Sequence, residues 1–261
     1  MRKSEREYYD HNPNWGKDLS CPDTIRIQET LALLPQGITT VLDIGCGDGR
    51  LTDRIPASLV IGLDFSDVGL TTVKVPKVVG SVDQLPFRDH AVDVVVCTEV
   101  LEHLGDDVLA RTVDEIKRVA KKYILISTPC CENLFLSSTR CGQCGCVFHI
   151  SWHVRSFDMP DLIKRFAGFN VKAWRFFGER QAYESPFWLW WIRRVGGKWP
   201  INEAAICPDC GNTRCGSEKG NWIAWVCERM YWRLAKIMPF RRKPYWMAIL
   251  FERKSQSETD R

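Results

Sequence analysis

The stretch that decides the fold is TVLDIGCGDG, residues 40–49, an apolar and β-branched run that enters a glycine-rich turn. Residues 39–44 predict a buried strand. The glycines that follow let the backbone turn sharply and approach a ligand where a Cβ would collide. They alternate, and an acid precedes them, so the spacing differs from the GxGxxG of dinucleotide-binding enzymes. The stretch therefore predicts a cofactor-binding turn at the end of a strand.

Three later stretches support a cofactor site. Residues 59–66, LVIGLDFS, predict a second strand, and Asp64 near its end is suited to bind two ribose hydroxyls. Residues 80–87 read GSVDQLPF, and residues 93–104, DVVVCTEVLEHL, predict a strand that runs into a helix. One such motif alone also fits an ordinary strand and helix, in which Gly and Asp are caps. Four motifs in order favour the cofactor interpretation.

The four motifs resemble those of class I S-adenosylmethionine (SAM)-dependent methyltransferases, across residues 38–178 and 244–254. The resemblance implies that the first acid is linked to the amino group of SAM and that the glycines pass beneath its methionine part. The second acid then binds the ribose, and the third motif reads the adenine. The cofactor-binding positions implied are Asp43, Gly45, Cys46, Gly47, Gly49, Asp64, Phe65, Asp83, Gln84 and Thr98.

The ExxEH sequence at residues 99–103 resembles both quinone-pathway O-methyltransferases and small-RNA terminal ribose methyltransferases. In those enzymes these side chains and a later histidine hold a divalent ion on the acceptor oxygen. The resemblance implies catalytic roles for Glu99, Glu102, His103 and His153, with Mg²⁺ as a further cofactor. On a helix the first three would share one face. His149 is an alternative to His153, and a general base without metal or a simple helix-start pair are the other interpretations.

Strands alternate with helices along the rest of the chain. Helices are predicted over 106–120 and 158–167, and further strands over 123–127, 169–177 and 245–251. This pattern predicts an α/β fold with a parallel sheet and helices on both faces. The family resemblance makes it a Rossmann-like, doubly wound, mostly parallel seven-stranded sheet whose last strand is antiparallel.

Two CxxCG sequences, at residues 141–145 and 207–211, are typical of zinc knuckles. The two-residue spacing lets both sulfurs reach one tetrahedral ion. We expect a structural Zn²⁺ on Cys141, Cys144, Cys207 and Cys210, which resembles a zinc ribbon. A redox role is less favoured, because neither pair opens a helix after a strand. Substitute ligands or a second site would use Cys146, His149, Cys215 or Cys227, and Cys46 and Cys97 are interpreted as small buried hydrophobes.

The motifs divide the chain into a core and a lid. We expect an N-terminal helical segment, 1–37, over the cofactor. The SAM-binding core, 38–128, is completed by 153–178 and 244–254. A zinc-clipped substrate lid is formed by 129–152 and 179–243, and a disordered tail by 255–261.

The second half of the expected lid is rich in tryptophan and in positive charge. Residues 186–254 contain thirteen Lys or Arg against five Asp or Glu. We interpret the aromatic residues first as packing of a small subdomain, because Trp222, Trp225 and Trp232 share one helical face. A membrane-surface contact and a stacking platform for RNA are the alternatives.

Composition sets the remaining bounds. The 261 residues are 45% hydrophobic and 26% charged, as in soluble globular proteins. No apolar run approaches the ~18 to 20 residues of a spanning helix, and the polar start lacks a signal-peptide core. We therefore expect a cytoplasmic protein, with peripheral membrane attachment as the alternative. Twelve cysteines then favour thiol or metal chemistry over disulfides.

The expected activity is SAM-dependent methyl transfer. The position after the fourth strand lacks the NPPY-like sequence that the family uses for planar nitrogens, which favours an oxygen acceptor. The first interpretation is O-methylation of a small-molecule or lipid-linked metabolite. The alternatives are RNA ribose 2′-O-methylation and a non-catalytic zinc-ribbon binding module on a SAM-binding scaffold. The sequence identifies neither the acceptor nor the oligomeric state.

Overall fold

The computed structural model describes residues 9–10, 15–181, 186–202, 205–217, 219–235 and 243–255. Its chain forms two compact units. The core unit comprises Asn14–Cys131, Phe157–Glu179 and Pro244–Arg261, and the cysteine-rich unit comprises Met1–Pro13, Glu132–Ser156 and Arg180–Lys243. His153, which the sequence assigned to the core, falls in the cysteine-rich unit. The expected disordered tail lies outside the described residues, apart from Ser255.

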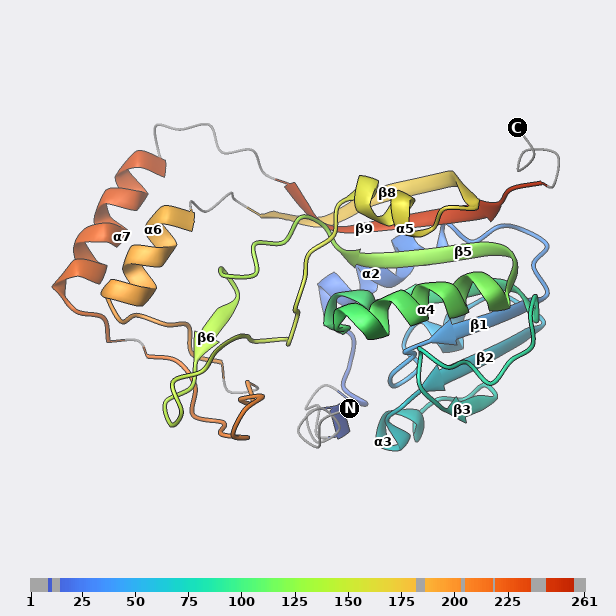
Figure 1. The fold of residues 1–261 in the computed structure, drawn as a ribbon, viewed down its shortest axis with the longest axis horizontal. Coiled ribbons are helices and arrows are strands. Elements are labelled where there is room, and N and C mark those ends of the chain that lie inside the picture. Colours follow the sequence, from blue (N-terminus) through green and yellow to red (C-terminus); the bar gives the residue numbers. More distant parts are fainter. Residues whose placement is uncertain are drawn as a thin grey trace. The chain divides into compact units, whose positions relative to one another are not determined.

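A seven-stranded sheet forms the core unit, in the order β3-β2-β1-β4-β5-β9-β8 (Figure 1). The neighbours from β3 to β5 run parallel, and β9 runs antiparallel to β5. The predicted α/β fold with a mostly parallel seven-stranded sheet is therefore confirmed. The strands are β1 (Thr40–Ile44), β2 (Leu59–Asp64), β3 (Lys77–Val79), β4 (Val92–Thr98), β5 (Ala120–Pro129), β8 (Phe169–Gln181) and β9 (Lys243–Arg253).

Strand register brings the polar ends of three strands to one edge of the sheet. Ile44 of β1 is level with Leu63 of β2 and with Cys97 of β4. The residues that follow these three positions therefore leave the sheet together. Because parallel strands place their carboxyl ends at the same edge, this is where ligands bind in open α/β sheets.

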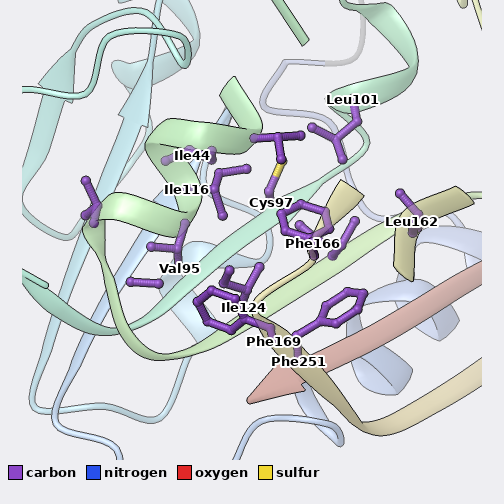
Figure 2. Packing of buried hydrophobic residues seen from close by; sticks show 14 of the residues in the cluster. Ile44, Val95, Cys97, Leu101, Ile116, Ile124, Leu162, Phe166, Phe169 and Phe251 are labelled. Atoms are coloured by element: carbon purple, nitrogen blue, oxygen red, sulfur yellow. The ribbon is translucent and has the colours of Figure 1, made fainter. Parts of the chain in front are cut away.

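Side chains that alternate along the strands make two apolar layers, one on each face of the sheet. Figure 2 shows the first layer, in which α4 (Asp106–Val119) and α5 (Met159–Arg165) cover inward residues such as Val95 and Ile124. The second layer lies under α2 (Cys21–Leu31) and the 3₁₀ turn η1 (Thr52–Arg54). Burial on both faces explains why the strands read as continuous apolar runs. Two short elements, α3 (Asp67–Leu70) and the 3₁₀ turn η2 (Leu101–His103), follow β2 and β4.

The cysteine-rich unit has its own small core. An antiparallel hairpin, β6 (Ser138–Arg140) with β7 (Val147–His149), flanks the first CxxC sequence. Its core cluster contains Cys141, Phe148, Ala205, Cys207 and Cys215. In the described part of its segment Arg180–Lys243, the helical elements are α6 (Pro186–Trp190), a π-helical turn η3 (Trp191–Val195) and α7 (Trp222–Ala235). Among the described residues, no helix has the length and apolar character that a membrane crossing requires.

Candidate functional site

The glycine-rich turn after β1 has the backbone that its sequence predicts. Gly45, Gly47 and Gly49 all have positive φ, at 69°, 55° and 80°. The amides of Gly45 and Cys46 both donate to the Leu63 carbonyl, at 2.7 and 3.1 Å. A Cβ at position 45 would lie 2.3 Å from Cγ2 of Val100. Glycine is therefore required at 45 by space as well as by conformation.

Asp64 fastens this turn to the end of β2. One carboxylate oxygen accepts the Gly47 amide at 2.8 Å, and the other accepts the Ser66 amide at 2.9 Å. The residue is 6% exposed. Since each carboxylate oxygen can accept more than one hydrogen bond, these amides leave acceptor capacity for a ligand. The predicted ribose ligand is thus also a structural clamp of the loop.

Asp43 is buried at the end of β1 and has one hydroxyl donor. Thr52 Oγ1 donates to Asp43 Oδ2 at 2.7 Å. Burial raises the pKa of Asp43 to about 7, although the Thr52 hydrogen bond opposes the shift. A carboxyl group in this state gains most from a nearby cation, such as the ammonium of an amino acid. No motif marks Thr52, because its contact with Asp43 forms only when the turn after β1 places η1 beside the strand.

Trp15 packs on the turn from the N-terminal side. A Cβ on Gly47 would lie 2.9 Å from the Trp15 ring, and one on Gly69 would lie 3.5 Å from it. The Gly16 amide also donates to Asp48 at 3.1 Å. The N-terminal segment therefore reaches the predicted cofactor loop. Its place over a bound cofactor stays a prediction, and residues 1–8 and 11–14 lie outside the described residues.

Asp83, the predicted adenine ligand, is ion-paired to α4. Arg111 donates to Asp83 Oδ2 at 2.8 and 3.1 Å, and Ser81 donates to the other oxygen. The hydrogen bonds from Ser81 and Arg111 lower the pKa of Asp83. An adenine amine would have to share this carboxylate with Arg111. The other predicted cofactor positions are placed as follows: Gln84 is exposed, Phe65 and Cys46 are half-buried and Thr98 is buried.

The ExxEH sequence does not form the predicted helix. Glu99 has a positive φ of 56° and precedes a single 3₁₀ turn, η2, that holds Glu102 and His103. The Glu99 amide still pairs with the Ser127 carbonyl of β5 at 3.0 Å. Because the sheet ladder extends one residue past β4, the chain must reverse within Glu99 itself. The prediction that Glu99, Glu102 and His103 share one helical face is therefore wrong. The chain instead has a left-handed residue, Glu99, followed by the 3₁₀ turn η2.

The acids of this segment have defined partners in the core unit. Trp246 Nε1 donates to Glu99 at 3.0 Å, and Thr128 Oγ1 donates to Glu102 at 3.2 Å. Glu102 is 1% exposed. A ligand oxygen of Glu102 and a ring nitrogen of His103 lie within 4.8 Å of each other. A buried carboxylate and an imidazole at this spacing can hold a divalent ion or move a proton.

His153, the fourth predicted catalytic residue, belongs to a buried acid–histidine cluster of the cysteine-rich unit. Glu132 accepts from His149 Nε2 at 3.2 Å and from His153 Nδ1 at 2.6 Å. The two imidazole rings are stacked at 4.3 Å. Burial alone raises the pKa of Glu132, but hydrogen bonds from both histidines lower it to about 2. Sequence reasoning missed Glu132, because no motif surrounds it.

The backbone assigns the tautomers in this cluster. His149 Nδ1 accepts the amides of Ser151 and His153, at 3.2 and 3.3 Å. Its proton therefore lies on Nε2, which donates to Glu132. His153 donates from Nδ1, so in the neutral ring its lone pair lies on Nε2. His149 is thereby engaged as a donor, which disfavours it as a metal ligand, while Glu132 gives His153 the orientation that a ligand or base needs.

The two CxxC sequences meet, although more than sixty residues separate them. The Sγ atoms of Cys141 and Cys210 lie 3.6 Å apart, and so do those of Cys144 and Cys207. All four sulfurs lie within 4.8 Å of one another. The Asn212 side-chain amide and the Gln143 backbone amide point at Cys141 Sγ, at 3.5 and 3.4 Å. Four convergent sulfurs with amide donors fit a tetrahedral Zn²⁺ site.

Thiol acidity does not distinguish these cysteines from the proposed substitutes. Burial raises the pKa of Cys207, and although a backbone amide lowers the pKa of Cys210, burial and the neighbouring thiols raise it to about 12. Burial opposes ionisation of Cys141, yet the amide donors lower its pKa to about 5. Burial raises the pKa of Cys146 to about 12 and that of Cys215 to about 11. Among the residues that the structure describes, these two and Cys227 join no metal-ligating group. Cys97 is fully buried in the core, as interpreted from its motif.

The segment that contains the glycine-rich turn and the first strands of the sheet is similar to known methyltransferases. Residues 42–125 match the family described as Methyltransferase domain. A probable S-adenosylmethionine-dependent methyltransferase of Mycolicibacterium smegmatis is 41% identical over 98 residues, which cover 34% of this chain and 37% of that protein. A small RNA 2′-O-methyltransferase of Arabidopsis thaliana is 32% identical over 113 residues, which cover 35% of this chain and 12% of that protein. The matches thus span well under half of these curated relatives.

The fold has solved counterparts. A SAM-dependent methyltransferase from Archaeoglobus fulgidus matches with a TM-score of 0.52 at 20% identity, covering 87% of this chain and 91% of that chain. The seven-stranded sheet therefore has the Rossmann-like fold of that methyltransferase, and the glycine-rich turn follows β1 at the edge where ligands bind in such sheets.

Proposed function

We propose, from the class I SAM-dependent methyltransferase domain that this chain carries over residues 42–125, that the protein transfers a methyl group from SAM to an oxygen atom of a small-molecule or lipid-linked metabolite. The observation that supports the proposal most is the Asp64 clamp. Both oxygens of this buried acid accept loop amides, which places glycine backbone and carboxylate side by side at the sheet edge.

The residues of this edge fit SAM. The Asp43 carboxyl, which burial leaves with a raised pKa, suits the ammonium of the methionine part. Asp64 retains lone pairs for the ribose hydroxyls, and the glycine turn lets the cofactor approach the backbone. Bound SAM would supply an activated methyl group on its sulfonium. The protein's own task is then alignment of the acceptor and removal of its proton.

Glu102 and His103 are the residues that we assign to that proton. Glu102 is buried and held by Thr128, so it stands as a fixed acceptor beside the imidazole. His103 then takes the proton of the acceptor hydroxyl as a general base. In a second form of the proposal, Glu99, Glu102, His103 and His153 would hold a magnesium-class ion, which would lower the pKa of that hydroxyl. Glu132 supports the second form, because it orients the His153 ring.

A labelling experiment tests the proposal. The protein is incubated with methyl-labelled SAM and cell extract, and RNA, lipid, protein and small-molecule fractions are then separated. Label in the lipid or small-molecule fraction is the expected result. Binding of SAM in calorimetry with no labelled product would contradict enzymatic activity and favour a non-catalytic binding module.

RNA ribose 2′-O-methylation is the second candidate. It is favoured by the ExxEH sequence together with the 32% identity to the Arabidopsis small RNA 2′-O-methyltransferase. Label that appears in the RNA fraction, and that is resistant to base hydrolysis at the modified ribose, would replace the metabolite proposal by this one.

We further propose that Cys141, Cys144, Cys207 and Cys210 hold one structural Zn²⁺. The four convergent sulfurs and the amide donors at Cys141 support this assignment. Because these ligands come from two distant segments, the ion would fasten the halves of the cysteine-rich unit together. A cytoplasmic location stays a prediction.

A further inference from the structure

One face of α7 is packed inside the cysteine-rich unit. Ala224, Cys227 and Tyr231 are 2%, 7% and 9% exposed. Their spacing of three and four residues makes a single stripe along the helix. A Cβ on Gly196, just after η3, would lie 2.5 Å from Cβ of Ala224, so the two segments are in close contact. This stripe sets the rotation of α7 about its axis.

The opposite face of α7 carries exposed tryptophans. Trp222 is 73% exposed and Trp225 is 61% exposed. At 100° per residue, both lie roughly opposite the Ala224 stripe. The interpretation of these residues as core packing is therefore wrong for both, while the Trp232 side chain lies outside the described residues. Exposed indoles next to each other mark a surface that something else covers.

Neighbouring α6 adds further exposed aromatic rings. Phe187 and Trp190 are 60% and 49% exposed, and they are three residues apart on one helical face. Figure 1 shows α6 and α7 side by side within their unit. Four large aromatic side chains thus reach solvent from two adjacent helices of one small unit.

The charged residues of α7 indicate the chemistry of a partner that would bind its exposed face. Arg229 and Arg233 continue the face of Trp222 and Trp225, and both are exposed. The one acid within α7 is Glu228, which pairs with Lys198 at 2.7 Å. The free charge of this face is therefore positive. A surface that combines exposed indoles with arginines fits an anionic partner.

Ring geometry favours a lipid surface over RNA. The guanidinium of Arg229 lies over the Trp225 ring, 5.3 Å from its centroid. That contact covers one face of the ring, so only the other face is left for a nucleic acid base to stack on. At a bilayer, by contrast, indoles insert at the headgroup level while arginines bind anionic headgroups. We propose that the exposed face of α7, aided by the aromatic residues of α6, docks the protein on an anionic membrane surface.

Vesicle co-sedimentation tests this docking in the full chain. Vesicles of phosphatidylcholine and phosphatidylglycerol in equal parts should bind the protein, and pure phosphatidylcholine vesicles should bind it more weakly. The double variant Trp222→Ala/Trp225→Ala should reduce the partition coefficient by about tenfold. Arg229→Glu should reduce binding only to the anionic vesicles. Trp174→Ala is the matched control, because Trp174 is 54% exposed on β8 and should leave binding unchanged.

Zinc content and SAM affinity, measured in parallel, show that each variant is folded, so failure of docking is distinguishable from failure of the proposed enzymatic function. Equal binding of the double variant and the wild type would overturn the proposal. So would an equal loss in Trp174→Ala. Absence of vesicle binding together with binding to single-stranded RNA that the double variant loses would replace lipid by nucleic acid.

Discussion

Two acids of the core unit and two clusters of the cysteine-rich unit are held in different ways. In the core, backbone amides hold the carboxylate of Asp64, and the Thr39 and Thr40 amides hold that of Asp93. In the cysteine-rich unit, side chains hold side chains: Cys141 meets Cys210 from 69 residues away, and Glu132 accepts from two histidines. Backbone donors persist when a side chain is replaced, whereas side-chain partners are lost. A single side-chain substitution should therefore leave the amide donors of Asp64 and Asp93 in place, but it should disturb the whole cysteine cluster or the whole Glu132 cluster.

The largest expected effect is the loss of zinc. Cys144→Ser or Cys207→Ser should lower the zinc content from about one ion per chain to near zero, because a structural site needs four ligands. Since binding of structural zinc contributes about 10 to 16 kcal/mol in small domains, the cysteine-rich unit should also unfold. Elemental analysis counts the metal, and hydrogen exchange compares the two units.

Cys146→Ser is the matched control for zinc. Cys146 lies five residues beyond Cys141 in the same unit, but among the described residues it joins no metal-ligating group. It should retain zinc and protection from exchange. Full zinc content in both ligand variants would mean that the ion has other ligands.

The second prediction concerns the histidines that the proposal assigns to the acceptor's proton. His103→Ala should reduce turnover by about 10²- to 10⁴-fold, the contribution of a positioned base, while SAM affinity stays within about twofold. Initial rates with the acceptor identified by labelling, together with calorimetry, measure the two quantities. If the bound-ion form of the proposal holds, His153→Ala should show a similar loss.

Controls distinguish the general-base form of the proposal from the bound-ion form. His90→Ala removes an exposed histidine of the core and should leave turnover unchanged. After exhaustive chelation, with zinc retained, activity that returns only with magnesium supports the ion. Full activity without added metal leaves His103 as a simple base, and unchanged turnover in His103→Ala would remove this residue from the mechanism.

A third prediction compares Asp43 and Asp93, two acids of the core whose pKa values are shifted in opposite directions. The raised pKa of Asp43 means that the free energy of unfolding falls as pH rises from about 4 to about 7 and is level above that. Asn cannot ionise, so Asp43→Asn should remove this fall. At pH 8 the variant should be more stable than the wild type by up to about 4 kcal/mol, and equally stable near pH 3.5. Urea unfolding at several pH values measures this.

Asp93→Asn should behave in the opposite sense. Hydrogen bonds from the Thr39 hydroxyl and the Thr39 and Thr40 amides lower the pKa of Asp93 to about 2. Its stabilisation is present above the unfolded value of 3.8 and is lost as pH falls through about 2. Asp93→Asn should therefore destabilise the neutral protein. The same pH slope in both variants would contradict the assignment of Asp43 as a buried acid.

How far the sequence predicts the molecule depends on the range of the interactions involved. The strand that enters the glycine turn at Gly45 and the CxxC pairs are local patterns, and both form as expected. The sheet follows because alternating strands and helices leave few topologies open. Thr52, Arg111 and Glu132 carry no motif, since each meets its partner only after the chain has folded.

Two misplaced features show why local periodicity fails. Glu99, Glu102 and His103 have helical spacing, but the ladder between β4 and β5 continues to the Glu99 amide and prevents the helix. The α7 tryptophans likewise have the spacing of a core stripe. Ala224 faces inward instead, because Gly196 lies too close for a larger side chain at that position, and Cys227 is buried on the same stripe. Periodicity identifies a face, and only packing decides which face is buried.

Asp64→Asn tests the role of Asp64, whose carboxylate is held by the Gly47 and Ser66 amides. Its remaining carbonyl oxygen can still accept one loop amide, so the turn should stay folded, whereas Asp64→Ala loses both acceptors. We expect SAM affinity to weaken by about 1.5 to 3 kcal/mol in Asp64→Asn, because a charge-assisted hydrogen bond is lost. Calorimetry at matched thermal stability measures it. Unchanged affinity would contradict the ribose assignment and leave Asp64 as a loop clamp alone.

The smallest effect is expected from Glu132→Gln in the side-chain-held cluster. Glutamine has one acceptor oxygen, and its NH₂ group would face the N–H of one histidine. Two backbone amides hold His149 in its tautomer, so His153 is the ring that must turn. Turnover should fall by about tenfold, as for other residues that orient a ligand histidine, with SAM affinity and zinc content unchanged. Glu228→Gln, which removes a surface ion pair of the same unit, should change neither. If Glu132→Gln keeps full turnover while His153→Ala loses it, Glu132 is not the residue that positions His153.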